Sequence, residues 1–139
     1  MSFLLDTDLI SDSTKPLPSE KAANWRRRHE DGNFFLSVIT LGEIEYGIAR
    51  KVPSRDKRRL EAFLRELVLA FSGRILPIDQ AVTSVWGKLR AEAERHGRPL
   101  PMVDGLLAAT AKFHGLTIAT GNTSDFSATG VPLVNPFLD

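Results

Sequence analysis

The chain has 139 residues, of which 42% are hydrophobic and 25% charged, with a formal net charge of +1. These values predict one globular domain spanning residues 1–139 and argue against a disordered or fibrous protein. The absence of cysteine excludes a disulfide framework, a thiolate zinc site, an iron–sulfur cluster and a cysteine nucleophile. No apolar run reaches the roughly 20 residues of a membrane-spanning helix, so we expect a soluble, cytoplasmic protein.

The first half of the chain predicts strands and helices in alternation. Residues 3–5 are typical of a short buried strand, and Ser19 suits the N-cap of a helix that runs to about residue 29. Turn chemistry at Asp31-Gly32-Asn33 precedes an apolar run at residues 34–39, which we expect to be a buried strand. Thr40 is expected to open the next helix.

The same alternation continues to the end of the chain. Residues 60–71 carry the strongest amphipathic helix pattern, with apolar side chains at helical spacing. The other expected elements are a strand at 75–78, a helix capped by Asp79, a helix at about 103–114, and strands at 116–120 and 131–134. Together these elements predict an α/β fold, a three-layer sandwich with a mostly parallel central sheet flanked by helices.

Four acidic residues follow the predicted strands or open the helices after them. Asp6 comes directly after the first strand, Glu43 lies early in the helix after residues 34–39, Asp104 opens a helix, and Asp125 follows residues 116–120. Ligand sites in parallel sheets form at the carboxyl ends of the strands. Four carboxylates meeting there would repel one another unless a cation were bound, and oxygen ligands favour Mg²⁺ or Mn²⁺.

Each of these acids also has a purely structural explanation. Asp6 and Asp8 suit the first turn of a short helix, where a negative charge is favourable. Thr40-Leu41-Gly42-Glu43 matches a capping box, with Thr40 as N-cap. Asp104 also suits a helix N-terminus, and Asp125 suits an ordinary turn. The prediction of a metal site therefore depends on the set of acids and on no single member.

Basic residues occur in clusters that have two interpretations. They are solvated helix faces, or they form a track for a phosphodiester backbone. The clusters are Arg26-Arg27-Arg28, Arg50-Lys51, Arg55 with Lys57-Arg58-Arg59, and Arg90, Arg95 and Arg98. We find no P-loop, no dinucleotide-binding glycine motif and no nucleophile elbow.

Four segments of the chain resemble, in order, the motifs of PIN-domain ribonucleases. They are Leu4-Leu5-Asp6-Thr7-Asp8-Leu9-Ile10-Ser11 and the segments at 37–48, 101–111 and 120–126. Their order and spacing, together with the chain length, are similar to those of the VapC-type toxins of bacterial toxin–antitoxin pairs, including the FitB-like branch. The resemblance covers nearly the whole chain.

The resemblance implies a Mg²⁺-dependent endoribonuclease, with Mn²⁺ as the alternative ion. The family's metal-binding, catalytic acids correspond to Asp6, Glu43 and Asp104. Some PIN domains place the fourth acid where this chain has Asn122, and Asp125 lies three residues later. The residues expected to contact these acids or the substrate are Asp8, where many relatives have Asn, Thr120 and Asn122.

The resemblance also implies partners. It predicts a homodimer, an RNA substrate and a cognate antitoxin that blocks the acidic site, with DNA contacted only through the antitoxin and no membrane association. An acidic site favours an arginine from such a partner, because charge-assisted hydrogen bonds are strong.

Two other functions are compatible with the same residues. A non-catalytic module that binds RNA or protein would use the four acids only as caps and turns. A phosphatase of the haloacid dehalogenase type would use Asp6-Thr7-Asp8 as its nucleophile motif, but Ile10 departs from that motif. The residues do not distinguish RNA from DNA as the target of a nuclease.

Overall fold

The strands that the structure describes form one parallel sheet. The computed structural model describes residues 1–29 and 33–138. The sheet has five strands in the order β3-β2-β1-β4-β5, and each described pair is parallel. Their bounds are β1 Phe3–Leu5, β2 Phe34–Ser37, β3 Ile75–Leu76, β4 Thr117–Ala119 and β5 Leu133–Val134. The predicted α/β fold with a mostly parallel sheet is confirmed.

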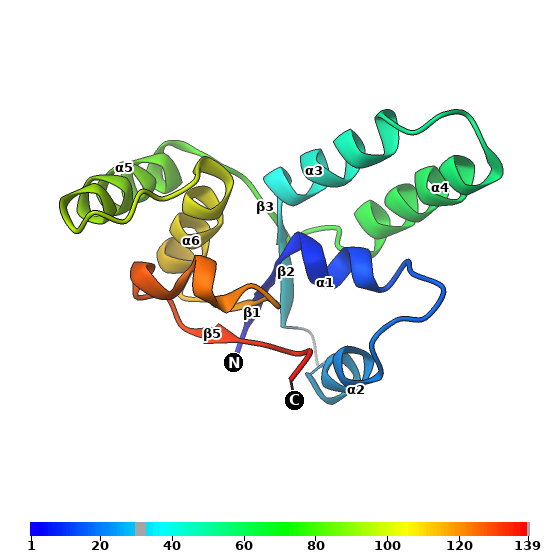
Figure 1. Ribbon diagram of the computed structural model, residues 1–139, viewed down its shortest axis with the longest axis horizontal. Coiled ribbons are helices and arrows are strands. Elements are labelled where there is room, and N and C mark those ends of the chain that lie inside the picture. The colour runs from blue at the N-terminus through cyan, green and yellow to red at the C-terminus, as the bar shows by residue number, and fades with distance from the viewer. Residues whose placement is uncertain (30–32, 139) are drawn as a thin grey trace.

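Helices connect these strands and cover the sheet. They are α1 Thr7–Asp12, α2 Glu20–His29, α3 Val38–Ala49, α4 Arg55–Ala70, α5 Gln80–Arg95 and α6 Met102–His114, followed by the 3₁₀ turns η1 Thr123–Asp125 and η2 Ser127–Thr129. In Figure 1, α5 and α6 lie on the left of the strands, and α3 and α4 lie on the right. No helix in the described ranges is long and apolar enough to cross a membrane.

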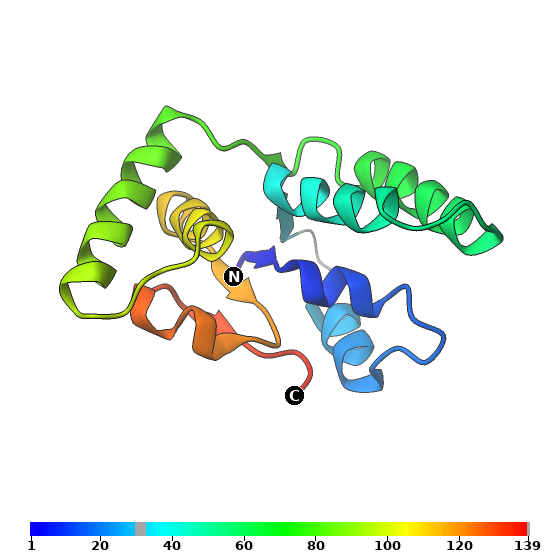
Figure 2. The same ribbon diagram turned by 45° about the horizontal axis from the view of Figure 1, so that its top comes forward.

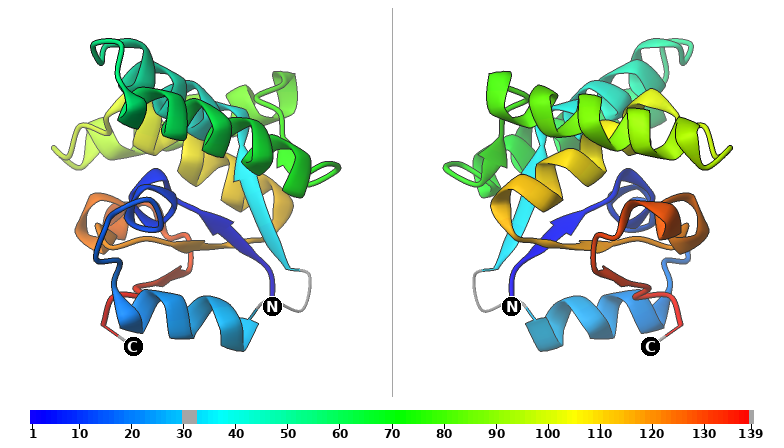
Figure 3. Two further views of the ribbon diagram at one scale, coloured as in Figure 1. Left: turned by 90° about the vertical axis from the view of Figure 1, so that its right-hand side faces the viewer. Right: turned by 90° about the vertical axis from the view of Figure 1, so that its left-hand side faces the viewer.

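The central strand β1 contributes to a separate hydrophobic core on each side of the sheet. Phe3 and Leu5 pack in one core with Trp25 of α2, while Leu4 packs in the other with Leu107 of α6. Successive side chains of a strand point to opposite faces, so an unbroken apolar strand requires helices on both sides. Leu67 of α4 packs in the same core as Trp25, whereas Leu89 of α5 packs in the core of Leu107. Figure 3 shows the two sides in turn, with α4 and α2 toward the viewer in the left view and α5 and α6 in the right view. The predicted three-layer arrangement follows from this alternation.

Side-chain caps fix where the early helices begin. The Ser19 hydroxyl accepts a hydrogen bond from the Ala22 amide at 3.1 Å, as predicted for the start of α2. Asp12, at the end of α1, accepts from the Ser19 amide at 3.0 Å and so ties α1 to α2. Asp79 likewise caps α5 through the Val82 amide. Residues 31 and 32 of the predicted Asp31-Gly32-Asn33 turn lie outside the described residues.

The structure corrects the predicted boundary at residues 34–40. Strand β2 ends at Ser37, whose hydroxyl accepts from the Ile39 amide at 3.1 Å and acts as the N-cap of α3. Val38 and Ile39 therefore belong to the helix, and the predicted capping box at Thr40 is wrong. An apolar run of this kind does not distinguish a buried strand from a buried helical turn by its periodicity. Glu43 is therefore not part of a capping box.

A close contact between α5 and α6 places the N-terminal turn of α6. A Cβ atom at Gly105 would lie 2.9 Å from the Trp86 ring, which is closer than such atoms approach in real structures. Glycine thus allows the indole of α5 to pack directly on the backbone of α6. Because Asp104 precedes Gly105 in the chain, the same contact also fixes the position of Asp104, a candidate site residue.

We predict that Gly105→Ala destabilises the protein, while Gly87→Ala, in α5, stabilises it. The first change forces a bulky ring and a helix apart, which costs about 1–3 kcal/mol. The second adds a methyl group in open space within a helix and gains up to about 1 kcal/mol. Urea denaturation of the three proteins measures both effects. Equal free energies of unfolding for the two variants would contradict this account of the α5–α6 contact.

Candidate active site

Asp6 lies at the carboxyl end of the central strand, where it also begins α1. One carboxylate oxygen accepts from the Thr7 amide at 2.7 Å, and the other accepts from the Thr120 hydroxyl at 2.8 Å. The Thr120 hydroxyl in turn accepts from the Asn122 amide at 2.9 Å. The helix-capping explanation of Asp6 is therefore correct, but it accounts for only one of the two oxygens. The second oxygen joins Asp6 to the loop that follows β4.

Glu43 reaches the same edge of the sheet from α3. Its Oε1 accepts a hydrogen bond of 2.6 Å from the Thr7 hydroxyl. Thr7 thus connects two candidate acids, because its amide binds Asp6 and its hydroxyl binds Glu43. Thr7 was not among the site residues predicted from the sequence. Its position between Asp6 and Asp8 was the available signal, but nothing local indicates that its hydroxyl faces a residue 36 positions later.

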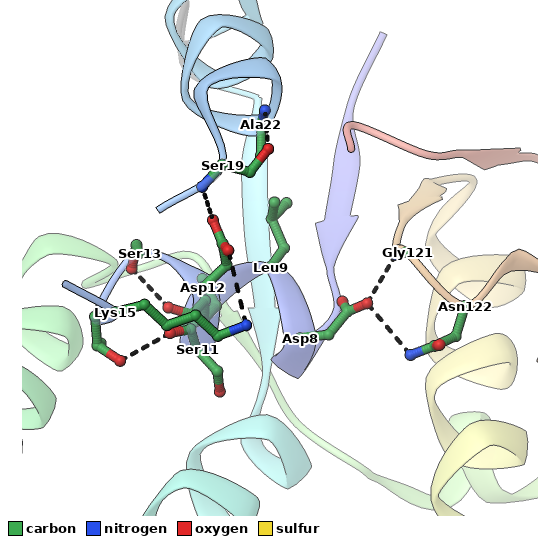
Figure 4. Close-up of polar contacts among 12 residues, drawn as sticks. Asp8, Leu9, Ser11, Asp12, Ser13, Lys15, Ser19, Ala22, Gly121 and Asn122 are labelled. Atoms are coloured by element: carbon green, nitrogen blue, oxygen red, sulfur yellow. Dashed lines mark hydrogen bonds and ion pairs between the residues drawn. The ribbon is translucent and has the colours of Figure 1, made fainter. Parts of the chain in front are cut away.

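Asp8 joins α1 to the loop after β4, as Figure 4 shows. Its Oδ2 accepts from the Gly121 amide at 2.8 Å and from the Asn122 side-chain amide at 3.3 Å. A Cβ at Gly121 would lie 2.8 Å from this oxygen, so the contact requires glycine there. The other oxygen, Oδ1, is buried and has no hydrogen-bond partner in the described part of the chain. Asp8 therefore holds the loop of Thr120 and Asn122 in place.

Asp104 and Asp125 bring two further carboxylates to this edge. Asp104 is half-buried in the first turn of α6, and Asp125 is exposed at the end of η1. Both line a hollow of about 300 Å³. Asp104 makes no side-chain cap at the start of its helix, where Pro101 is the N-cap residue. Asp104 does lie at a helix N-terminus, as its structural explanation predicted, but no side-chain cap holds its carboxylate there, and Asp125 does lie in a turn.

The acids form a continuous patch of negative charge. Burial, the largest cause, and the charges of Asp8 and Glu43 together raise the pKa of Asp6 to about 6, although the hydrogen bonds from Thr120 and Thr7 lower it. Burial also raises the pKa of Asp104, with contributions from the charges of Asp125 and Glu43. The charge of Glu43 raises the pKa values of both Asp6 and Asp104, so Glu43 interacts with each of these two acids. Charge interactions thus link Asp6 to Glu43, and Asp104 to both Glu43 and Asp125, although these acids come from distant parts of the chain.

The donor set of this patch fits a hard divalent cation. Every candidate ligand is a carboxylate oxygen, and within the described residues neither Asp6 nor Asp104, whose pKa values are raised, forms an ion pair with a basic side chain. Within residues 1–29 and 33–138, however, no three acidic or histidine side chains are close enough to hold one ion as they stand. The chemistry of the patch therefore favours Mg²⁺ or Mn²⁺, and binding requires the carboxylates to approach one another.

The raised pKa of Asp6 predicts how the stability of the metal-free protein depends on pH. Its folded pKa of about 6 lies above the ordinary 3.8, so folding takes up a proton between these values. The free energy of unfolding should rise as the pH falls from 7 towards 4. Asp8 and Asp104 act in the same direction, because burial raises their pKa values too.

We expect Asp6→Asn to stabilise the metal-free protein at pH 7 by about 2 kcal/mol. A shift of two pKa units corresponds to roughly 3 kcal/mol, less about 1 kcal/mol for weaker hydrogen bonds. Chemical denaturation in EDTA at pH 7 and pH 5 gives both values. The variant should show a smaller gain between these pH values than the parent protein. An unchanged pH dependence would show that Asp6 is not the titrating group.

Comparison with known proteins identifies the family. The model of the PIN domain family matches residues 3–131. The chain is 38% identical to the toxin FitB of Neisseria gonorrhoeae over 138 residues, which is 99% of each chain. It is 34% identical to VapC ribonuclease Y4jK of Sinorhizobium fredii, with 97% of each chain covered. It is 30% identical to the tRNA(fMet)-specific endonuclease VapC of Shigella flexneri, over 94% of this chain and 93% of that protein.

Solved structures show the same similarity over the whole fold. The chain superposes on FitB in a crystal structure of FitAcB from Neisseria gonorrhoeae with a TM-score of 0.90, at 38% identity, over 97% of this chain and 98% of that chain. A structure of FitAB bound to an IR36 DNA fragment gives a TM-score of 0.89 at 37% identity, over 97% and 95%. The chain therefore belongs to the PIN-domain family, among the VapC and FitB toxins of bacterial toxin–antitoxin systems.

Proposed function

We propose that this protein is a Mg²⁺-dependent endoribonuclease that acts as the toxin of a toxin–antitoxin pair. The observation that carries the proposal is the patch of mutually interacting carboxylates at the carboxyl edge of the sheet, formed by Asp6, Glu43, Asp104 and Asp125. Family membership supports it, because several relatives are named ribonucleases or endonucleases.

The ion would be held by Asp6 and Asp104, with Glu43 between them. Burial and mutual repulsion make these carboxylates costly to ionise without a cation, so a divalent ion relieves their charge. When bound, Mg²⁺ or Mn²⁺ supplies Lewis acidity, which lowers the pKa of a water molecule and offsets developing charge on the phosphate. Asp125, exposed at the rim, adds negative charge from farther out.

The protein's own residues orient the reacting groups. Glu43 has one oxygen fixed by the Thr7 hydroxyl, which leaves the other to hold the ion or to orient and accept a proton from the attacking water. Asp6 is fixed at both oxygens by Thr7 and Thr120. The side-chain amide of Asn122 is committed to Asp8, so its carbonyl oxygen is the group left to meet a water or the substrate.

The proposed partners follow from the family and from exposed apolar side chains. Relatives are seen in complexes of the FitAB and VapBC type, some of them with DNA. We propose a cognate antitoxin for this chain, with DNA reached only through it, and a homodimer. Val38, Tyr46 and Met102 are exposed apolar residues of α3 and α6 that are available for such contacts. The haloacid dehalogenase alternative has no support in the comparisons.

Cleavage of RNA tests the proposal directly. We expect the antitoxin-free protein to cut total RNA into discrete fragments with Mg²⁺ and not with EDTA. Asp104→Asn should reduce the rate by roughly 100-fold or more, because it removes a charge that holds the ion. Electrophoresis of the fragments and sequencing of their ends measure both the activity and the target.

The matched control is Glu66→Gln, which removes a carboxylate from the exposed surface of α4 and should cut normally. The cleavage rate of Thr7→Val should lie between those of Glu66→Gln and Asp104→Asn, about tenfold below the parent, since Glu43 loses its hydrogen-bond donor. Equal cleavage by Asp104→Asn and the parent would sink the proposal. Absence of cleavage together with metal-independent RNA binding would favour the non-catalytic module.

Binding of Mg²⁺ should also raise the melting temperature. At an ion concentration about ten times the dissociation constant the gain is roughly 1.4 kcal/mol, or about 4 °C for a domain of this size. The shift should shrink below pH 6, where protons compete for Asp6. It should be absent in Asp104→Asn and retained in Asp56→Asn, which changes an exposed acid of α4 paired with Arg59. An equal shift in both variants would place the ion elsewhere.

A further inference from the structure

A hollow adjoins the acidic patch on the side of α5. It has a volume of about 300 Å³, and Asp104 and Asp125 are among the residues that line it. Leu89, Ala93 and Leu100 contribute apolar surface to its wall, and Arg98 lies at its rim. The hollow therefore combines apolar surface, a cation and direct access to the proposed catalytic carboxylates.

Two further hollows continue from this one along α5. Their volumes are about 370 and 550 Å³, and all three are lined by Ala128 of η2, so they adjoin one another. The larger of these two is lined by Lys88 of α5 and Lys112 of α6. Figure 2 shows the turns η1 and η2 beside the end of α5, and α5 contacts η2. We call these three hollows the α5–η2 groove.

The charges along the groove are available for an anionic ligand. Arg98, Lys88 and Lys112 are exposed, and none of them forms an ion pair with another residue of the described ranges. Besides Asp104 and Asp125, the groove is lined by Glu92, which is paired with Arg95 and lies near His96. The part of the groove at Asp104 and Asp125 repels phosphate unless a metal ion is bound there. The rest of the groove offers the unpaired basic side chains of Arg98, Lys88 and Lys112.

This order of groups matches a single-stranded nucleic acid that passes through a metal-dependent nuclease site. The scissile phosphate must lie at the carboxylates with their ion, and the next phosphates must meet cations. An unstacked base needs apolar surface, which the first hollow offers at Leu100 and its neighbours. A volume of about 300 Å³ is at the lower end of the range for small-molecule pockets, which suits one nucleotide.

We propose that the α5–η2 groove binds the RNA strand on one side of the scissile phosphate. The hollow beside Asp104 and Asp125 takes one nucleotide, Arg98 binds its phosphate, and Lys88 and Lys112 bind the phosphates that follow. Among the basic clusters of the sequence, the groove selects Arg98 as a substrate contact. The inference rests on the proposed ribonuclease function and adds to it the path of the substrate.

The test measures binding of RNA separately from cleavage. The probe is a fluorescein-labelled dodecamer of oligouridylate, and the parent is the full-length Asp6→Asn protein without metal, studied by fluorescence anisotropy. Arg98→Ala and the double variant Lys88→Ala/Lys112→Ala should each weaken binding by roughly fivefold or more. Each lost phosphate contact should also reduce the slope of log affinity against log salt by about 0.7.

Matched variants distinguish binding in this groove from a general attraction between RNA and the positive charge of the protein. Arg65→Ala removes the same charge from the exposed face of α4 and should change the affinity by less than about twofold. Ala128→Leu fills the groove without a change of charge and should weaken binding, while Ala70→Leu, at the exposed end of α4, should not.

The outcomes distinguish this inference from the proposed function. If the parent binds the strand and the groove variants bind equally well, the inference is wrong even where the wild-type protein cuts RNA. If the parent does not bind the strand, the inference is also wrong. The proposed function fails separately, when wild-type protein with Mg²⁺ leaves every RNA intact.

Discussion

Repulsion among half-buried carboxylates is the interaction on which the active-site edge depends. Asp6 is nearly enclosed by protein and lies near Asp8 and Glu43, so the ionised state is costly without a cation. Hydrogen-bond donors offset part of this cost, since the Thr7 amide and the Thr120 hydroxyl donate to Asp6 and the Thr7 hydroxyl donates to Glu43. The sheet and helices thus bring together carboxylates whose charge the proposed divalent ion would relieve once they approach one another.

The position of β1 explains how residues so far apart meet. β1 pairs with β2 on one side and with β4 on the other, and all three point the same way. Their carboxyl ends therefore deliver Asp6, the start of α3 and the loop of Thr120 to one edge. Asp104 arrives by another route, since α6 is placed by the packing of Trp86 on Gly105. Asp104 also lines the α5–η2 groove, so the helix packing that places this residue also forms the wall of the proposed RNA path.

Much of the fold was predictable because its signals are local. The amphipathic pattern at residues 60–71, the caps Ser19 and Asp79, and the short apolar strands all depend on neighbours in sequence. The boundary of β2 was misplaced because Ser37 and Thr40 are both suitable caps, and only the packing of the following helix selects Ser37. The candidate acids were also predictable as a set, since they follow strands and match family motifs.

The sequence by itself determined the element order, the all-oxygen donor set and the acids that could hold an ion, because these are properties of residue type and spacing. Only the tertiary structure decided which groups touch: Thr7 on Glu43, Thr120 on Asp6, and Asp8 on the loop at Gly121. It also decided which arginine lies beside the carboxylates, Arg98. The physical reason is that these contacts join residues up to 114 positions apart, and such distances are closed by sheet pairing and helix packing, which no local pattern encodes.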